Sequence, residues 1–226
     1  MFSVLFEVHP KSDQWDAYLG YAKLLRPELQ RVEGFIDNIR YGSKRREGWV
    51  LSLSTWRDEK ALVRWRTHAL HHDVQEKGRR EVFQDYHLRV ARVTADSHVP
   101  EGPLIRDPPP DETEVGESKV VTLVAAAWSE TLHENAPVET IAARLGFRAD
   151  ASGLVAWDLF EALLTPGDRL LLLSWRDSLS ADAGEAAMPD AGRRRRLNVV
   201  RDYGMFERYE APQYYPEIPR GRGPPR

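Results

Sequence analysis

Apolar and polar residues alternate along the start of the chain, which is the pattern of a strand with one buried face. The strand is predicted over Phe2–Val8, with its apolar residues at the even positions. The spacing then lengthens to that of a helix, which Ser12 or Asp13 can cap and Pro27 can end or kink. The apolar face of this predicted helix carries Trp15, Tyr18, Leu19, Ala22 and Leu25.

The following segments predict a hairpin, a second helix and a closing strand. Phe35–Gly42 and Trp49–Trp56 form the hairpin around the charged loop Ser43–Gly48. Asp58 caps the second helix, and Tyr86–Val93 closes the sheet. The apolar positions of that helix are Leu62, Trp65, Ala69 and Val74. The order of elements is therefore β-α-β-β-α-β.

The second half of the chain repeats the first. Trp56-Arg57-Asp58 recurs as Trp175-Arg176-Asp177 at an offset of 119, and Arg79–Tyr86 is matched with Arg196–Tyr203 at an offset of 117. Shared order and spacing indicate an internal duplication. The elements expected in the second copy are a strand Val120–Ser129, a helix Pro137–Leu145, a hairpin Gly153–Leu164 with Leu170–Trp175, a weaker second helix and a last strand Tyr203–Tyr209.

A segment between the two copies has the composition of a linker. Thr94–Ser118 contains five prolines and seven acidic residues and lacks apolar periodicity. The predicted organisation is a first unit at 1–93, an acidic proline-rich linker at 94–118, a degenerate second unit at 119–210 and a Pro/Tyr/Arg-rich tail at 211–226. We expect limited proteolysis to cut first within Ala95–Ser118.

These patterns predict an α+β fold, with tandem ferredoxin-like repeats and antiparallel sheets. A four-stranded sheet covered by two helices leaves its other face apolar, so two such sheets can bury those faces against each other. The two sheets could belong to one chain or to two.

Composition narrows the class of protein. The absence of cysteine excludes disulfides, thiolate metal sites and a cysteine nucleophile, and it fits a reducing cytoplasm. The N-terminal segment lacks the basic region of a signal peptide, and no apolar run approaches the ~20 residues that span a bilayer. The net charge of -3 does not favour nucleic acid as a partner. We expect a cytoplasmic protein with no membrane partner.

Several segments of the first unit carry a resemblance to a known family. They are Glu33-Gly34-Phe35-Ile36, the Leu-Ser-x-Trp-Arg-Asp run ending at Asp58, Trp65-x-x-His68, Gln75-x-x-Gly78-Arg79 and Asp85-Tyr86. Together they resemble the antibiotic-biosynthesis-monooxygenase (ABM) type of dimeric α/β-barrel proteins. The resemblance implies a barrel built from two ferredoxin-like units, a homo-oligomer, and either cofactor-free oxygenase chemistry or haem degradation.

Haem degradation in such relatives uses an Asn on the first strand and a His about three turns beyond a Trp on the second helix. This chain has Phe6 and Glu7 on that strand and Gln75 ten residues after Trp65. The departure makes haem doubtful as a cofactor, and no cofactor is expected.

Three histidines and a tryptophan on the second helix are the candidate catalytic residues. His68 and His72 are one turn apart, and an imidazole with a pKa of ~6.5 suits proton abstraction near neutrality. Solvated or hydrogen-bonded histidines are the alternative interpretation. Trp65 could form the wall of a flat aromatic pocket or pack in the core. No third ligand stands near the histidine pair, so no metal is expected.

Two further features have competing interpretations. Glu7 lies on the strand face opposite Phe6, so inside a barrel its pKa would be raised and it could act as a base, or it could pair with an arginine. The run Arg193–Arg196 is expected on a helix, as a solvated charged face.

The function expected from the resemblance is that of a cofactor-independent monooxygenase acting on a small aromatic substrate. His68 or His72 would deprotonate it, and the carbanion would reduce dioxygen directly. Trp65 would stack on the substrate, Trp56 and Phe6 would line its pocket, and Arg66 or Arg79 would hold its anion. The alternative is a non-catalytic protein that binds a small molecule or haem.

Overall fold

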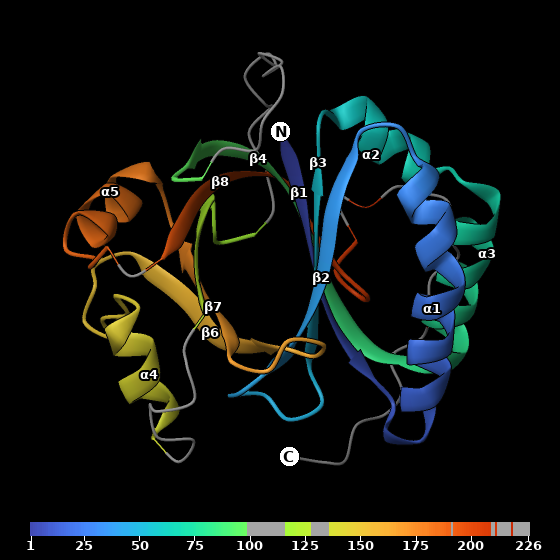
Figure 1. Cartoon of the computed structure of the whole chain (residues 1–226), viewed down its shortest axis with the longest axis horizontal. Helices are drawn as coiled ribbons and strands as arrows, with labels where there is room; N and C mark the ends of the chain where they lie inside the picture. Colours follow the sequence, from blue (N-terminus) through green and yellow to red (C-terminus); the bar gives the residue numbers. More distant parts are fainter. Residues whose placement is uncertain (99–115, 128–135, 191, 209–210, 212–217, 219–226) are drawn as a thin grey trace.

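The computed structural model describes residues 1–98, 116–127, 136–190, 192–208, 211 and 218, and in these residues the strands close into one antiparallel barrel (Figure 1). The strand order around it is β1-β3-β2-β6-β7-β5-β8-β4, and β4 pairs with β1. The first unit contains β1 (Phe2–Pro10), α1 (Trp15–Arg31), β2 (Phe35–Ser43), β3 (Val50–Trp56), α2 (Glu59–Arg66), α3 (Ala69–Lys77), a π-turn (Gly78–Val82) and β4 (Phe83–Asp96). The second contains β5 (Val120–Ala127), α4 (Val138–Arg144), β6 (Leu154–Ala162), β7 (Asp168–Trp175), α5 (Ser178–Ala186) and β8 (Arg193–Gly204).

The two units have the same internal strand order, as the duplication predicts. The first runs β4-β1-β3-β2 and the second β8-β5-β7-β6, and β2–β6 and β4–β8 pairing joins them. Trp56 lies opposite Phe2 in its unit, and Trp175 lies opposite Val120 in the other. The α+β architecture of tandem ferredoxin-like units is thus confirmed, and the units pair within one chain.

The last strand of the second unit was predicted in the wrong place. Leu5 lies opposite Arg89 in the first unit, and Leu123 lies opposite Arg195 in the second, so the last strands match at an offset of 106, not 117. The observed strand β8 begins at Arg193 and ends at Gly204.

The four arginines therefore form a strand, and the expectation of a helical, solvated face is wrong. Arg193 pairs with Asp96 of β4, while Arg194 and Arg196 point to α5, where both contact Glu185. Arg195 is buried and donates to Thr55 Oγ1 at 3.2 Å. Alternation along a strand separates the like charges onto two faces, which a count of charges does not reveal.

The helices also differ from the prediction at two points. Pro27 lies inside α1, which continues to Arg31. The second helix of the first unit is broken after Arg66, and α3 starts at Ala69 with His68 as its N-cap residue. Asp58 caps α2 as predicted, by accepting from Ala61 N at 2.8 Å, and Asp177 caps α5 in the same way through Ser180 N.

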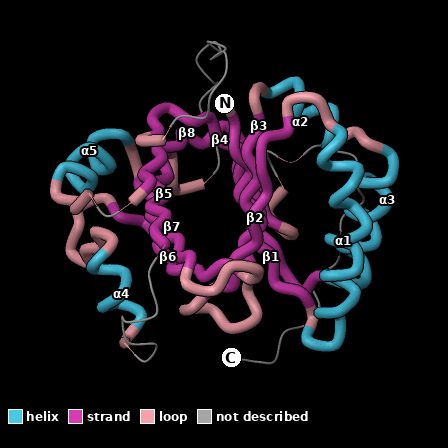
Figure 2. Tube along the Cα trace, in the orientation of Figure 1, coloured by secondary structure: helices cyan, strands magenta, loops and turns pink. Residues whose placement is uncertain are grey.

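The molecule has a barrel core and two helical layers (Figure 2). Helices α1, α2 and α3 cover the outer face of the first unit, and α4 and α5 cover the second. On β1 the even positions face the helices, whereas Leu5 and Glu7 face the barrel interior. Among the described residues, no helix is both long and apolar enough to cross a membrane. Most of the expected linker, 99–115, lies outside the described residues.

Candidate active site

The outer face of the first unit's sheet is buried at its ends and partly exposed in its middle. On β1, Phe2 and Val8 are buried, but Val4 and Phe6 between them are partly exposed. The same change occurs on β3 and extends to β4. We call this strip the central band, and it consists of Val4, Phe6, Ser52, Ser54, Leu88 and Val90.

Helix α1 crosses above the central band. Near one end, Tyr18 packs in a buried cluster with Val8 and Val50, and near the other, Leu29 packs in a separate cluster with Phe2. The helix is therefore held to the sheet at two places, and the band lies beneath the stretch between them. Apolar strand positions that stay partly exposed beneath a helix are candidates for contact with a small molecule.

Polar groups gather at the β2 edge of the band. Arg40 lies opposite Ser52 in the strand register, and Asn38 Nδ2 donates to Ser52 Oγ at 2.9 Å. Tyr18 is 6% exposed, and its hydroxyl and the Nε of Arg40 are buried without a hydrogen-bond partner in the described part of the chain. Burial raises the pKa of Tyr18, although the neighbouring Arg40 guanidinium lowers it in part. The phenol therefore stays protonated near neutrality.

His68 lies at the helix break. Its Nε2 is 3.7 Å from Glu28 Oε2, and its ring centroid is 5.6 Å from that of Trp65. The other ring nitrogen, Nδ1, is buried and makes no hydrogen bond to any described residue. Trp65 and His68 thus remain neighbours, as expected, although they no longer share one helix. A buried ring nitrogen without a protein partner is suitably placed to exchange a proton with a ligand.

Trp65 is held from its other side by His71. The two rings stack with centroids 4.2 Å apart, and His71 Nδ1 lies 3.0 Å from the Trp65 carbonyl oxygen. Because a carbonyl only accepts, Nδ1 carries the hydrogen. Burial lowers the pKa of His71 to about 4, with the neighbouring imidazoles of His68 and His72 adding to the effect against this hydrogen bond. His71 is therefore neutral near pH 7 and supports the tryptophan.

The other residues expected at the site fall into two groups. Phe6 lies in the central band, with its ring centroid 5.5 Å from that of Tyr86. Trp56 and Arg79 are buried outside the central band. Trp56 Nε1 donates to Ser54 Oγ at 2.9 Å, and Arg79 donates to the Tyr86 hydroxyl. Arg66 ends α2 and His72 follows the helix break in α3, and both are partly exposed.

In the second unit, the β6 and β7 positions of the same strip carry apolar side chains. By strand register, Leu171 corresponds to Ser52, Leu173 to Ser54 and Leu159 to Arg40. These leucines are at most 1% exposed and belong to a single apolar cluster beneath α4 and α5. The first layer, as far as the structure describes it, combines a partly exposed floor with a tyrosine hydroxyl and an arginine Nε that are buried without a geometric hydrogen-bond partner.

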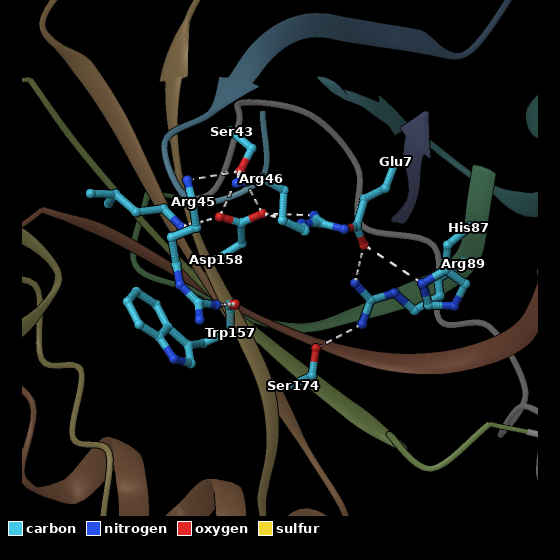
Figure 3. Close-up of polar contacts among 10 residues, drawn as sticks. Glu7, Ser43, Arg45, Arg46, His87, Arg89, Trp157, Asp158 and Ser174 are labelled. Carbon is cyan, nitrogen blue, oxygen red and sulfur yellow. Dashed lines mark hydrogen bonds and ion pairs between the residues drawn. The ribbon is translucent and has the colours of Figure 1, made fainter. Parts of the chain in front are cut away.

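A second group of polar residues lies inside the barrel and forms a network of ion pairs (Figure 3). Glu7 pairs with Arg46 at 2.5 Å and with Arg89 at 2.6 Å, and Arg46 reaches Asp158 at 2.7 Å. Arg89 also donates to Ser174 Oγ across the barrel. The network links β1 and β4 of the first unit with β6 and β7 of the second.

The expectation of a raised pKa for Glu7 is wrong. Burial raises it, but the charges of Arg89, Arg46 and His87 together lower it further, so the pKa of Glu7 lies below its ordinary value. For Asp158, burial is the larger effect and raises the pKa even though Arg46 and Ser43 oppose it. Glu7 is therefore a paired carboxylate in the barrel interior, as the second interpretation of its sequence position held.

Sequence reasoning missed Arg40, Asn38 and Ser52 at this site. One signal was present, because Ser52 and Ser54 occupy positions of the predicted strand that should face the helical layer, where apolar residues are the rule. Arg40 and Tyr18 are brought together by packing between α1 and β2, and no spacing within the chain indicates that contact.

The geometry agrees with the comparisons with known proteins. The model of a family described as "Antibiotic biosynthesis monooxygenase" (ABM) matches residues 1–77. Jasmonate monooxygenase ABM of Pyricularia oryzae is 47% identical over 221 residues, which cover 96% of this chain and 99% of that protein.

Solved structures add only remote likenesses. An anthrone oxidase-like protein is 13% identical with a TM-score of 0.34, over 93% of this chain and 96% of its own. A Pseudomonas aeruginosa protein with the same TM-score and 12% identity covers 39% of this chain and 87% of its own. The assignment of the fold therefore rests on the strand pairing described above. The near full-length identity with the fungal relative places this chain in the antibiotic biosynthesis monooxygenase family.

Proposed function

We propose that this protein is a cofactor-independent monooxygenase whose substrate lies on the central band. Membership of the family supports monooxygenase-type chemistry. The observation that carries the proposal is the buried Nδ1 of His68, which has no partner in the described structure and belongs to a ring beside Trp65. A base next to an apolar, partly exposed floor is the arrangement that deprotonation of a small organic substrate requires.

In the proposed reaction the substrate supplies all the electrons. His68 removes a proton from an activated methylene, and the carbanion transfers an electron to dioxygen. Recombination forms a carbon–oxygen bond, and protonation by His68 gives a hydroperoxide. Loss of water, with the second methylene proton, leaves a carbonyl group. One methylene group and one molecule of dioxygen thus give one carbonyl group and one molecule of water, so neither a metal nor a flavin enters the stoichiometry.

The side chains around the band have separate roles in this proposal. Phe6 provides apolar surface for the substrate, and the buried Trp65, stacked on His71, packs beside the His68 ring. Trp56 orients the Ser54 hydroxyl by donating a hydrogen bond to its oxygen. His72, Arg66 and Arg79 are retained as candidates, His72 for proton exchange and the arginines for holding an anion at the ends of the site.

Two substrate classes follow from different arguments. The partly exposed ring of Phe6 favours an aromatic substrate of the anthrone type. The fungal relative is named for jasmonate, whose ring ketone makes the C–H bonds beside it more acidic than those of an ordinary methylene. Both classes share the activated C–H bond that the mechanism needs.

The test is oxygen uptake by the purified chain with anthrone and with jasmonate, in the presence of a chelator and with or without added haem. We expect uptake with at least one substrate, unchanged by the chelator and independent of haem, and a product heavier by the exchange of two hydrogens for one oxygen. Uptake that requires haem would replace this proposal with a haem-dependent one. Tight substrate binding without any uptake would make the chain a binding protein.

A further inference from the structure

We propose that Arg40 and Tyr18 form a carboxylate-binding subsite at the β2 edge of the central band, and that it selects substrates carrying a carboxylate group. The inference rests on the proposed function for the location of the substrate, because it assigns one end of the same site.

Arg40 differs from three other arginines in and beside the sheet. Arg46, Arg89 and Arg193 each form an ion pair with a carboxylate at 2.7 Å or less. No described carboxylate lies within ion-pair distance of Arg40, and its Nε is buried without an acceptor. A buried guanidinium donor that lacks an acceptor costs free energy unless a ligand supplies one.

The Tyr18 hydroxyl is a second, independent sign of a missing acceptor. Its side chain is buried against Val8, Val50 and Val82, and its ring is fixed by edge contact with Phe83 at 6.4 Å. The hydroxyl lies within contact of the Arg40 guanidinium, whose charge and hydrogen bonding lower its pKa in part, while Arg40 Nε itself is buried without an acceptor. Two donors from different elements, α1 and β2, therefore lie next to each other.

The chemistry of these donors selects an anion with two oxygens. A guanidinium presents a planar fork that matches a carboxylate, and a protonated phenol adds a donor from another direction. Ser52 Oγ, opposite Arg40, is already engaged by Asn38 and closes the subsite on the side of β3. The apolar band that begins there would accommodate the uncharged remainder of the molecule.

The second unit shows what the same positions contain when no ligand is to be held. Leu159 replaces Arg40 there, and Trp157 replaces Asn38, with Leu171 in place of Ser52. These three positions are apolar in the second unit. Arg40 is therefore not needed to build a stable unit of this fold, which leaves recognition as the reason for a charge at this point.

The experiment is calorimetric binding of jasmonate and of its uncharged methyl ester under anaerobic conditions. The wild-type chain should bind the acid at least ~10-fold more tightly than the ester. In Arg40→Leu, which copies the second unit, we expect jasmonate affinity to fall about 10- to 100-fold while ester affinity changes less than about 3-fold. Arg40→Lys keeps the charge without the fork and should retain part of the preference. Tyr18→Phe should lose about 3- to 10-fold for the acid alone.

Arg26→Leu, at an exposed position of α1, is the matched control and should leave both affinities unchanged. Thermal melting of each variant separates misfolding from lost recognition. If Arg40→Leu does not fold, Arg40→Lys and Tyr18→Phe still test the inference. Equal loss for acid and ester, or a wild-type chain without preference for the acid, would overturn the inference. Absence of oxygen uptake leaves these binding results intact and counts against the proposed function alone.

Discussion

His68 is the residue on which the proposed chemistry depends most directly. Its Nε2 faces Glu28 at 3.7 Å, while its buried Nδ1 is left for a ligand. The neighbouring His71 has the opposite character, because its Nδ1 is committed to the Trp65 carbonyl and its pKa is lowered to about 4. Two of the three histidines at positions 68 to 72 thus have different environments. His68 is available to exchange a proton, and His71 supports the ring of Trp65.

Replacing His68 by Ala should lower turnover about 100-fold or more, which is the usual scale for loss of a general base, with little change in melting temperature. Steady-state oxygen uptake measures the first and thermal unfolding the second. Asp73→Ala, at an exposed position of α3, is the control and should leave turnover unchanged. Full activity in His68→Ala would remove this residue from the mechanism.

Truncation of Trp65 should act on stability. Trp65→Ala removes a buried ring that packs against Phe2 and Trp56, and the resulting cavity should cost ~3–5 kcal/mol in the free energy of unfolding. Denaturant titration provides the measurement. A cost below ~1 kcal/mol would show that the ring is not part of the packed layer.

The protonation of His71 makes a specific prediction about acid. Its pKa is lowered in the folded chain, so the unfolded chain binds its proton first as the pH falls from about 6.5 to about 4. Stability should decline over this range by at most about 3 kcal/mol. His71→Phe preserves the stacked ring and removes the titration, so it should flatten the decline in urea-unfolding experiments at several pH values. An identical pH dependence in both proteins would contradict the assignment.

At the scale of elements, the two units use one architecture for two purposes. The floor of the helical layer consists of Ser52 and Ser54 in the first unit and of Leu171 and Leu173 in the second. The leucines give one continuous apolar cluster, whereas the serines separate the first layer into two clusters with the central band between them. The second unit therefore has a continuously packed layer, whereas the layer of the first unit is less tightly packed along the central band.

Substitutions that exchange serine and leucine between the two units should have different effects in each unit. Ser52→Leu should place a bulky side chain in the central band and reduce substrate binding at least ~10-fold, while the fold persists because the second unit tolerates leucine there. Leu171→Ser in the second unit is the matched control. It should destabilise the chain by ~3–5 kcal/mol and leave substrate affinity unchanged. Undiminished binding in Ser52→Leu would place the substrate elsewhere.

At the scale of the whole molecule, two reciprocal side-chain contacts join the units across the barrel. Arg89 donates to Ser174 Oγ of the other unit, and Arg195, its equivalent, donates to Thr55 Oγ1, the equivalent of Ser174. The pairs β2–β6 and β4–β8 form the seams between the units. Each unit alone would expose two unpaired strand edges and an apolar inner face.

A fragment of residues 1–98 should therefore not persist as a folded monomer. We expect it to dimerise through its open sheet, or to aggregate, because exposed edges and apolar faces seek a partner. Light scattering coupled to size-exclusion chromatography gives the molecular mass. A folded monomeric fragment would show that the seams contribute little to stability.

The sequence by itself determined the repeat and the strand–helix order of the chain. Periods of two and of helical spacing depend on local geometry, so Phe2–Val8, the β2–β3 hairpin and the Asp58 cap could be predicted from neighbouring residues. The recurrence of Trp-Arg-Asp placed Trp56 and Trp175 at equivalent positions before any contact was known.

Only the tertiary structure decided where the charges lie and which of them act together. Arg193–Arg196 reads as a solvated run until pairing with β4 and β5 turns alternate side chains inward and outward. Glu7 has a lowered pKa because Arg46 and Arg89 reach it from distant strands. The meeting of Tyr18 with Arg40 also depends on how α1 packs on β2. Coulomb energies and hydrogen bonds depend on distances in space, and closure of the barrel sets these distances between residues far apart in the chain.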